Sequence, residues 1–331
     1  MDTYTLLALI VATALLFEFA NGWNDAANSI ATIVSTRVLK PLPAVAWAAF
    51  WNFVAAFTFG TAVAKTIGSK MIDLSLVNEW VLLAGLLGAI IWTGVCTWLG
   101  LPISVSHSLI GGYAGAAVAH AGFAALIAGG WVKPIAGILL APFIGLFGSV
   151  LISILTSWIV HRHPPQRVDR WFRRLQLLSA AAFSLGHGTN DAQKGMGIIT
   201  AALVTSGALS EYEVPFWVII SCHAAIAGGT LAGGWRVIKT MGQRITKLTP
   251  FGGFSAESAA ALTLFGTAMT GIPASTTHTV TGSIIGVGAS RRLTAVRWGI
   301  TQRILWAWVL TIPGAAALGA LFYWLFGALP G

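Results

Sequence analysis

The sequence predicts an all-α membrane protein that crosses the bilayer many times and consists of two related repeats. Its composition is 56% hydrophobic and only 9% charged, whereas soluble domains contain about 25% charged residues. The mean hydropathy is +0.80. Two pairs of motifs also recur at nearly constant spacing, which indicates an internal duplication. At about 20 residues per span, a chain of this length has room for about ten to twelve membrane segments and for no separate soluble domain.

The charge of the chain indicates a lipid bilayer rather than nucleic acid as its partner. The formal net charge is +9, but the basic residues stand in short loops between apolar runs, where they set the orientation of a membrane protein. Cys96 and Cys222 are isolated within apolar runs, so neither a disulfide nor a metal site is expected. The first residues lack the basic region of a secretory signal, and we expect the first apolar segment to be retained.

Apolar runs separated by polar breaks predict six segments in each repeat. In the first repeat, 1–160, they are 4–20, 24–37, 43–65, 80–99, 103–127 and 134–160; in the second, 175–331, they are 175–188, 190–206, 214–238, 255–270, 275–290 and 298–327. Between the repeats, 161–174 is rich in arginine and contains a pair of prolines. We expect this segment to be a solvated, cytoplasmic connector.

Two motifs occur in both repeats and in the same order. The first, here called the signature segment, reads Gly-Trp-Asn-Asp-Ala-Ala-Asn at 22–28 and Gly-Thr-Asn-Asp-Ala-Gln-Lys at 188–194. The second, here called the hydroxyl segment, reads Pro-Ile-Ser-Val-Ser-His at 102–107 and Pro-Ala-Ser-Thr-Thr-His at 273–278. Duplicated membrane domains of this kind are typical of secondary transporters.

Charge also predicts how the repeats are oriented. The connector and the loops at 236–247 and 291–303 are the most basic segments, so we expect all three on the cytoplasmic side. The chain must then cross an even number of times between them, which holds if 175–206 is one crossing, broken around Asn190-Asp191. Each repeat then has an odd number of crossings. The repeats are therefore expected to be inverted, with the N- and C-termini outside.

The signature segments place carboxylates inside the membrane, where an ionised group is costly and is therefore usually functional. We expect Asn24-Asp25 and Asn190-Asp191 at helix breaks that line a polar cavity. There they could coordinate Na⁺ or, through a protonated aspartate, carry H⁺. The structural alternative is a pair of buried helix caps without an ion.

Other polar residues in the apolar runs have two interpretations each. Lys194 could neutralise the nearby aspartate or face an anion, and His187 could handle a proton or be structural. Asn52 could form a helix–helix hydrogen bond. Glu257 could be interfacial, and Glu18 is equally ambiguous and has no counterpart in the second repeat.

Each hydroxyl segment has the pattern of the turn of a short helical hairpin, with a proline followed by Ser or Thr residues at the start of a helix. The free N–H groups, the helix dipole and the neutral hydroxyl donors at such an end suit a small oxyanion. A single such segment could equally be a simple cap. Two copies beside two acidic segments favour an anion-binding site.

These segments resemble, in order and over nearly the whole chain, those of the inorganic phosphate transporter family, often called PiT. The resemblance implies an inverted-repeat secondary transporter with broken helices and short helical hairpins. It also implies a role for one group of residues in binding cations and for another in binding phosphate. The former are Asp25, Asn28, Asp191 and the acidic Glu257, and the latter are Ser104, Ser106, Ser275, Thr276 and Thr277.

The chain departs from the family pattern at Asn52, where many sodium-coupled members carry a glutamate. One carboxylate of a symmetric pair is then missing, which favours coupling to H⁺ over Na⁺. The long central hydrophilic insertion of some members is also absent, which points to a compact prokaryotic form. Related permeases of the same superfamily carry sulfate, so a sulfate permease is the alternative substrate assignment.

The sequence thus predicts a transporter of the inner membrane that imports inorganic phosphate in symport with a cation, with no cofactor other than a coupling Na⁺ if sodium is used. Alternatives of other classes are a passive anion channel and an intramembrane aspartyl protease, which also needs two buried aspartates. A homodimer is left open. The candidate residues are, for cations, Asp25, Asn28, Asn24, Asn52, Asp191, Asn190 and Glu257; for protons, His187; and for phosphate, Ser104, Ser106, Ser275, Thr276, Thr277, Gln193 and Lys194.

Overall fold

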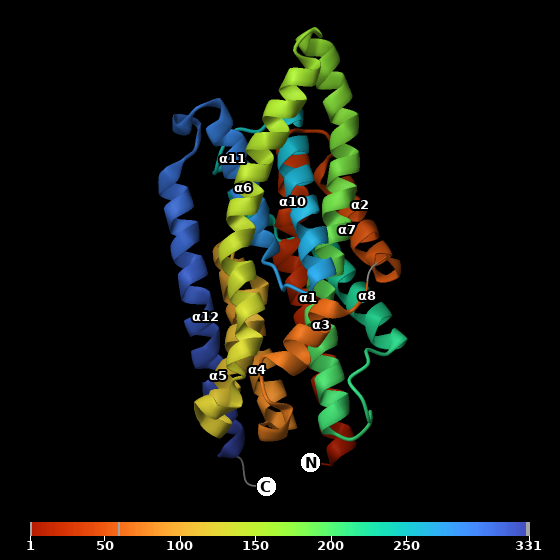
Figure 1. Cartoon of the computed structure of the whole chain (residues 1–331), viewed down its shortest axis with the longest axis vertical. Helices are drawn as coiled ribbons and strands as arrows, with labels where there is room; N and C mark the ends of the chain where they lie inside the picture. The colour runs from red at the N-terminus through yellow and green to blue at the C-terminus, as the bar shows by residue number, and fades with distance from the viewer. Residues whose placement is uncertain (1, 59, 329–331) are drawn as a thin grey trace.

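The computed structural model describes residues 2–58 and 60–328, and this part of the chain consists of helices joined by turns and short irregular segments, as predicted. Figure 1 shows an elongated helical bundle. Its helices are α1 (Thr3–Ser35), α2 (Pro41–Val54), α3 (Ala62–Lys65), α4 (Glu79–Leu99), α5 (Val105–Ala121), α6 (Val132–Val160), α7 (Pro165–Thr205), α8 (Phe216–Ala232), α9 (Trp235–Gln243), α10 (Pro250–Thr270), α11 (Thr276–Arg291) and α12 (Trp298–Gly327).

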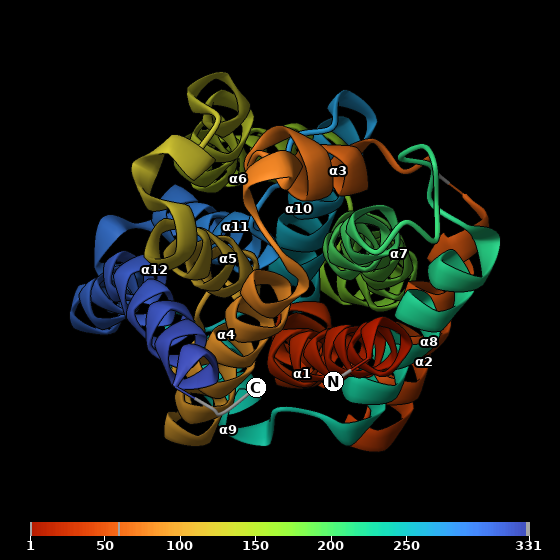
Figure 2. The same cartoon turned by 90° about the horizontal axis from the view of Figure 1, so that it is seen from below.

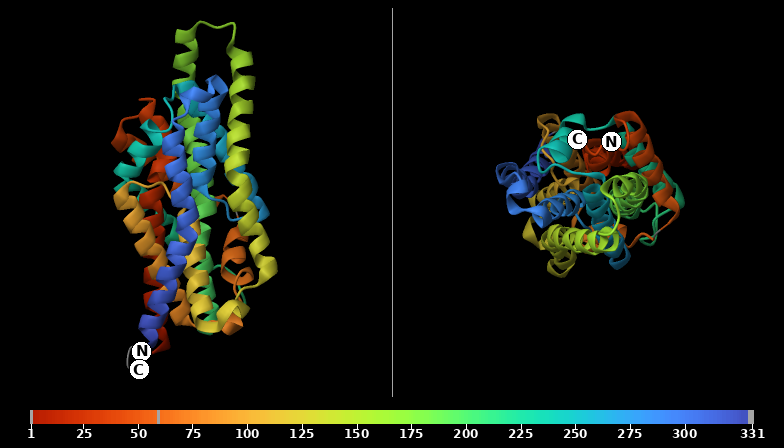
Figure 3. Two further views of the ribbon diagram at one scale, coloured as in Figure 1. Left: turned by 90° about the vertical axis from the view of Figure 1, so that its left-hand side faces the viewer. Right: turned by 90° about the horizontal axis from the view of Figure 1, so that it is seen from above.

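Helices α1–α6 and α7–α12 succeed one another in the same order, and equivalent helices run in opposite directions. In Figure 1, α1 rises from the lower end whereas α7 descends from the upper end, and α6 rises whereas α12 descends. Figure 3 shows both termini together, at the end opposite to the turn between α6 and α7. This arrangement is consistent with the predicted inverted repeat.

Broken helices are present, as predicted, at equivalent places in the two halves. Pro41–Phe57 and Ala62–Lys70 are bent by 78° at their break, and Phe216–Ala232 and Trp235–Gln243 by 75°. Among the described residues, four segments are long and apolar enough to cross a membrane by themselves: α1, α4, α12 and Ala128–Val160, which contains α6. Counting each bent pair as one span raises this number to six.

The breaks do not lie in the signature segments, so their predicted position was wrong. Helix α1 continues through Asn24-Asp25, and α7 continues through Asn190-Asp191. An unbroken helix pairs its own backbone groups, as the membrane interior requires, and these polar side chains find partners on neighbouring helices instead. The four residues therefore do not cap half-helices. The predicted segments 4–20 and 24–37 belong to one helix, α1, and the segments 175–188 and 190–206 belong to one helix, α7.

Helix α7 carries the second signature segment and is enclosed by protein. Helices α1, α2, α8 and α10 pack against it, and Figure 2 shows them around α7 in the view along the bundle. Polar side chains are tolerated at membrane depth when protein covers them. Helices such as α6 and α12 form the outer surface of the bundle. Their exposed side chains include Leu139, Phe143, Phe147, Leu151, Leu305, Trp306, Val309 and Leu310.

Two helical hairpins, α4–α5 and α10–α11, bring the hydroxyl segments into the interior, as predicted. Gly100 follows the last residue of α4 and Gly271 follows the last residue of α10, and their φ angles of 72° and 66° are accessible to glycine without strain. The second helix of each hairpin then begins within the hydroxyl segment. The hairpin tips meet, because the ring centroids of His107 and His278 are 4.5 Å apart.

The basic connector is exposed, as expected for a solvated segment, but it is largely helical. Helix α7 already begins at Pro165, since proline is favoured in the first turn of a helix. The connector therefore forms the projecting upper end of the α6–α7 hairpin (Figure 1). Near its base, Arg173 Nη1 donates a hydrogen bond to the backbone carbonyl of Arg37 at 3.2 Å.

Candidate functional site

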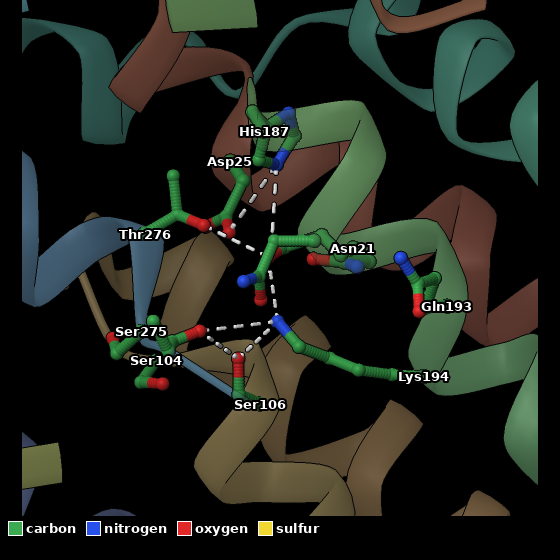
Figure 4. A network of polar contacts seen from close by, with 12 residues as sticks. Asn21, Asp25, Ser104, Ser106, His187, Gln193, Lys194, Ser275 and Thr276 are labelled. Atoms are coloured by element: carbon green, nitrogen blue, oxygen red, sulfur yellow. Dashed lines mark hydrogen bonds and ion pairs between the residues drawn. The ribbon is translucent and has the colours of Figure 1, made fainter. Parts of the chain in front are cut away.

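Both hydroxyl segments form helix N-termini in the protein interior. Ser104 caps α5 and accepts a hydrogen bond from the backbone N–H of His107 at 3.3 Å, and Ser275 caps α11 through the N–H of His278 at 3.2 Å. Both serines are buried. The positive ends of two helix dipoles therefore lie in the interior. Figure 4 shows both serines on the same side of the Lys194 ammonium group as Ser106.

Lys194 links the second signature segment to both hairpins. Its buried ammonium group donates to Asp191 Oδ1 at 2.6 Å, to the hydroxyl of Ser106 and to the backbone carbonyl of Ala274 at 3.5 Å. Ser106 belongs to α5, and Ala274 lies in the turn between α10 and α11. A fixed cation thus occupies the place where the two hairpin tips meet (Figure 4).

The two signature aspartates are buried, and each lies next to a hydroxyl of α11. Thr276 Oγ1 donates to Asp191 Oδ1 at 2.8 Å, and Thr277 Oγ1 lies 3.2 Å from Asp25 Oδ1. The Thr277 hydroxyl also accepts a hydrogen bond from Asn28 Nδ2 at 2.9 Å. The structure therefore places three of the predicted cation residues beside two of the predicted phosphate residues.

His187 lies between the two carboxylates. Its Nε2 is 3.7 Å from Asp25 Oδ2 and 3.5 Å from Asp191 Oδ2 (Figure 4). Ligand atoms of the three residues lie within 4.8 Å of one another. This spacing would suit either a small cation or a shared proton.

Neighbouring side chains determine the tautomer of His187. The hydroxyl of Thr230 donates to the carbonyl of Ile226 at 2.9 Å, so it can only accept a hydrogen bond from Asn52 Nδ2, also at 2.9 Å. The amide oxygen of Asn52 consequently faces His187 Nδ1 at 3.1 Å. Nδ1 must therefore carry a proton, which leaves Nε2 as the titrating atom that faces the carboxylates. Asn52 thus contacts the site through the imidazole.

The signature asparagines Asn24 and Asn190 point away from this centre. Asn24 Nδ2 donates to Thr97 Oγ1 of α4 at 2.6 Å, and Asn190 Nδ2 donates to Thr267 Oγ1 of α10 at 3.2 Å. Each residue thus ties a signature helix to the first helix of a hairpin. In this conformation neither contacts the Asp25, His187 and Asp191 group.

Gln193 also lies apart from the predicted phosphate residues. Its Oε1 accepts hydrogen bonds from the backbone N–H groups of Val63 at 2.8 Å and Ala64 at 3.2 Å, at the N-terminus of α3. Figure 4 shows its side chain apart from Ser106 and from the end of the Lys194 side chain. Gln193 therefore binds the N-terminus of α3, the second helix of the bent α2–α3 pair.

Glu257 belongs to a separate polar cluster. Its carboxylate accepts hydrogen bonds from Thr32 Oγ1 at 2.5 Å, Gln176 Nε2 at 3.0 Å and Ser179 Oγ at 2.5 Å. Thr32 stands seven residues after Asp25 on α1, two turns farther along the helix. Glu257 is fully buried.

Residues 21–319 match the profile of the Phosphate transporter family. The chain belongs to this family. It is 53% identical over 322 residues to the "Probable low-affinity inorganic phosphate transporter" of Rhizobium meliloti (strain 1021), with coverage of 97% of this chain and 96% of that protein. It is 46% identical over 334 residues to the protein of the same name from Bacillus subtilis (strain 168), with coverage of 99% and 100%. A solved structure described as "The sodium-dependent phosphate transporter" matches with a TM-score of 0.89 and 25% identity, over 98% of this chain and 100% of that chain.

Membership in the phosphate transporter family confirms the resemblance and makes the protein a transporter rather than an enzyme. The geometry agrees with this. Two protease aspartates share a proton in direct contact, whereas here His187 lies between Asp25 and Asp191, and Lys194 already pairs with Asp191. The alternative of an intramembrane aspartyl protease is therefore removed.

One acid of this phosphate transporter family member received no role from the sequence. Glu18 is fully buried on α1, and its Oε1 accepts a hydrogen bond from the backbone N–H of Gly195 at 2.7 Å. The spacing between Glu18 and Asp25 was the sequence signal that could have identified it. Glu18 precedes Asp25 by seven residues, which places both side chains on one face of the helix.

Proposed function

We propose that this member of the phosphate transporter family is a secondary active transporter that imports inorganic phosphate across the cytoplasmic membrane, driven by a proton gradient. The observation that carries the proposal is the position of Lys194, where the hairpins that contain the N-termini of α5 and α11 meet. A buried ammonium, two positive helix ends and the nearby hydroxyls of Ser106 and Thr276 suit a small oxyanion. The names of the relatives specify inorganic phosphate and support the same substrate.

Acceptors beside the hydroxyls favour phosphate over sulfate. At neutral pH phosphate both donates and accepts hydrogen bonds, whereas sulfate only accepts them. The carboxylates of Asp25 and Asp191 lie next to the hydroxyls of Thr277 and Thr276. The two hydroxyls now donate to Asp191 and to the carbonyl of Ile103, and they can hold an anion only after they turn towards it. An anion held in this way meets a carboxylate as an acceptor, to which phosphate can donate a hydrogen bond and sulfate cannot.

The ammonium group of Lys194 favours proton over sodium coupling, because it is a positive charge that the chain itself supplies. Lys194 pairs with Asp191, so this carboxylate does not need a sodium ion to neutralise it, and Asn52 adds no negative charge. His187 Nε2 faces Asp25 and Asp191. Because Nδ1 is already protonated, either a proton or a small cation must lie between Nε2 and the carboxylates, or lone pairs would face each other. We take this ion to be a proton that is coupled to transport.

Transport by the purified protein in proteoliposomes tests the substrate and the coupling together. We expect uptake of labelled phosphate to be driven by an inward proton gradient without sodium, to be abolished by a protonophore and to change little in excess sulfate. A strict sodium requirement at constant pH would contradict the proton coupling. Strong competition by sulfate would contradict the substrate assignment.

The buried carboxylates also favour coupled transport over a passive anion channel. Asp25 and Asp191 lie beside the proposed anion site, and unneutralised carboxylates would repel the anion that such a channel conducts. We further propose that the basic segments face the cytoplasm and that both termini lie outside.

A further inference from the structure

Glu18 is a buried acid that the proposed mechanism does not use. It lies on α1 and is fully shielded from solvent. Within the described part of the chain, no Lys, Arg or His nitrogen lies within 4.0 Å of its carboxylate. An uncompensated carboxylate at membrane depth is costly, so its presence calls for a functional explanation.

The groups that hold Glu18 are a weak set for a negative charge. Its Oε1 accepts from the Gly195 N–H at 2.7 Å, and its Oε2 accepts from Asn21 Nδ2 at 3.3 Å. Glu257, which is also buried, accepts three hydrogen bonds, two of them from hydroxyls at 2.5 Å. Short hydrogen bonds to an ionised group are the strong ones. Proton uptake by Glu18 would therefore remove a charge that its surroundings compensate poorly.

The surroundings of Glu18 also accommodate its protonated form. Asn21 is fully buried, and its Oδ1 has no hydrogen-bond partner among residues 2–58 and 60–328. If the amide of Asn21 turns over, this oxygen can accept a hydrogen bond from a protonated Glu18. Gly195 provides the space on the other side, because a Cβ there would lie 2.5 Å from Oε1. Any larger residue at this position would displace the carboxyl group.

The position of Glu18 connects it to the central site. It lies on the same face of α1 as Asp25 and about 10 Å away along the helix axis. The charged groups that act on it are Asp191 and Lys194 of α7, and the thiol of Cys222 faces it from α8. Helices α2, α4 and α9 also pack against α1, and in the described chain none of them contributes an ion-pair partner to Glu18.

We propose that Glu18 binds and releases one proton in each transport cycle, at a proton site separate from His187. This inference rests on the proton coupling proposed above. The carboxylate takes up H⁺ when this part of the transporter is open to the side of higher proton activity, and the resulting carboxylic acid returns H⁺ to the other side. Gly195 directly follows Lys194 in α7. Movement of Lys194 with the substrate therefore also moves the N–H that holds ionised Glu18, which couples proton release to the anion.

The test separates net uptake from exchange. Glu18→Gln removes the proton site but keeps an acceptor for the Gly195 N–H and gains a donor for the unpaired Oδ1 of Asn21. Exchange of external for internal phosphate needs no net proton movement, so it should proceed at the parental rate in phosphate-loaded proteoliposomes. Net uptake driven by a proton gradient should fall by about a hundredfold. The matched control, Glu211→Gln at an exposed position, should change neither.

Two results with Glu18→Gln would overturn the proposal. One is parental net uptake under a proton gradient. The other is an equal loss of exchange and net uptake in a folded protein, which indicates a structural role. If this variant does not fold, Glu18→Asp serves instead, because it keeps an ionisable group but withdraws it from Gly195. The pH profile of its net uptake should shift, and an unchanged profile would contradict the proposal.

Failure of the proton coupling can be told apart from failure of the Glu18 assignment. The parental protein alone tests the coupling. If the proton coupling is wrong, this protein will show no uptake under a proton gradient and will require sodium. The Glu18 assignment is tested only when uptake by the parental protein is driven by a proton gradient. It then fails if the Glu18 variants give one of the overturning results described above. Both comparisons use the full chain in the same proteoliposomes.

Discussion

At the scale of single residues, the charges of the central site balance without a metal ion. Asp25 and Asp191 contribute two negative charges, and Lys194 contributes one positive charge. In the proposed mechanism a proton on Nε2 of His187 supplies the second positive charge, and this atom lies within 3.7 Å of both carboxylates. Buried charges persist only when they are paired. An incoming phosphate adds negative charge, so its entry favours uptake of further protons, which is the physical basis of the proposed symport.

The two aspartates should differ in what their loss does to stability. Asp25→Asn and Asp191→Asn should both abolish proton-driven uptake, because each removes a charge without changing size. Asp191→Asn also leaves the buried ammonium of Lys194 without its 2.6 Å partner, which costs about 3–5 kcal/mol. We therefore expect a larger fall in the thermal unfolding temperature for Asp191→Asn, measured in detergent.

The double variant Asp191→Asn with Lys194→Gln serves as the control for the Asp191 prediction. It removes both buried charges, and it should recover most of the lost stability while remaining inactive in proton-driven uptake. Parental uptake by either aspartate variant would show that the carboxylate is dispensable. Equal unfolding temperatures of the two single variants would show that Lys194 does not depend on Asp191.

Ser275→Ala should weaken anion binding as well as the cap of α11. Loss of a hydroxyl donor to a charged acceptor costs about 1 kcal/mol or more, which corresponds to about a fivefold rise in the Michaelis constant for phosphate. Asn78→Ala is the matched control, because Asn78 caps α4 through the N–H of Val81 at 3.1 Å. Both variants should lose about 1 kcal/mol of stability. Equal Michaelis constants in the two would remove Ser275 from the anion site.

At the scale of helices, the sequence allows the N-termini of α5 and α11 to be predicted but not the positions of the breaks. A serine cap acts locally, on an N–H three residues later, so it can be read from a short segment. The continuity of α1 and α7 depends on partners far away in the chain. Thr97 lies 73 residues from its partner Asn24, and Thr277 lies 249 residues from Asn28. No local pattern reveals such partners.

The same limit applies to the site. The hydroxyls and aspartates could be assigned from the repeated motifs because each repeat carries them at matching positions. The partners of Asn52, Glu18 and Gln193 could not be identified from the sequence, because their contacts depend on how separate helices pack. Asn52 reaches His187, Glu18 reaches Gly195, and Gln193 reaches the N-terminus of α3. These three contacts join the two repeats to each other.

Close packing of α1 against α8 provides a prediction at the scale of helices. A Cβ at Gly229 would lie 2.0 Å from the carbonyl oxygen of Phe19, whereas a Cβ at Gly228 would meet nothing nearer than a ring carbon of Phe19 at 3.8 Å. Gly229→Ala should therefore force the helices apart and lower stability by about 1–3 kcal/mol or more. Gly228→Ala should be tolerated, because alanine favours helix. Similar unfolding temperatures for the two variants would contradict this packing.

At the scale of the whole molecule, two of the three basic segments predicted to face the cytoplasm are in contact with each other. The backbone N–H of Arg297 donates to the carbonyl of Ile245 at 2.9 Å, which joins the loops at 236–247 and 291–303. The connector lies at the end of the bundle opposite to the termini (Figures 1 and 3). The distribution of charge and the opposite directions of α1 and α7 therefore favour the same topology.

Labelling of single cysteines from each side of the membrane tests this topology. In a background without the two native cysteines, which are buried, the replaced residues are the exposed Gln166, Gln243, Ser75 and Glu211. A membrane-impermeant thiol reagent should label Gln166→Cys and Gln243→Cys only in inverted vesicles, and Ser75→Cys and Glu211→Cys in intact cells, because basic segments remain cytoplasmic. Labelling after permeabilisation confirms that each cysteine is reactive. Opposite faces for positions 166 and 243 would break the even number of crossings on which the inverted repeat depends, whereas reversal of all four would keep the repeat and place the termini inside.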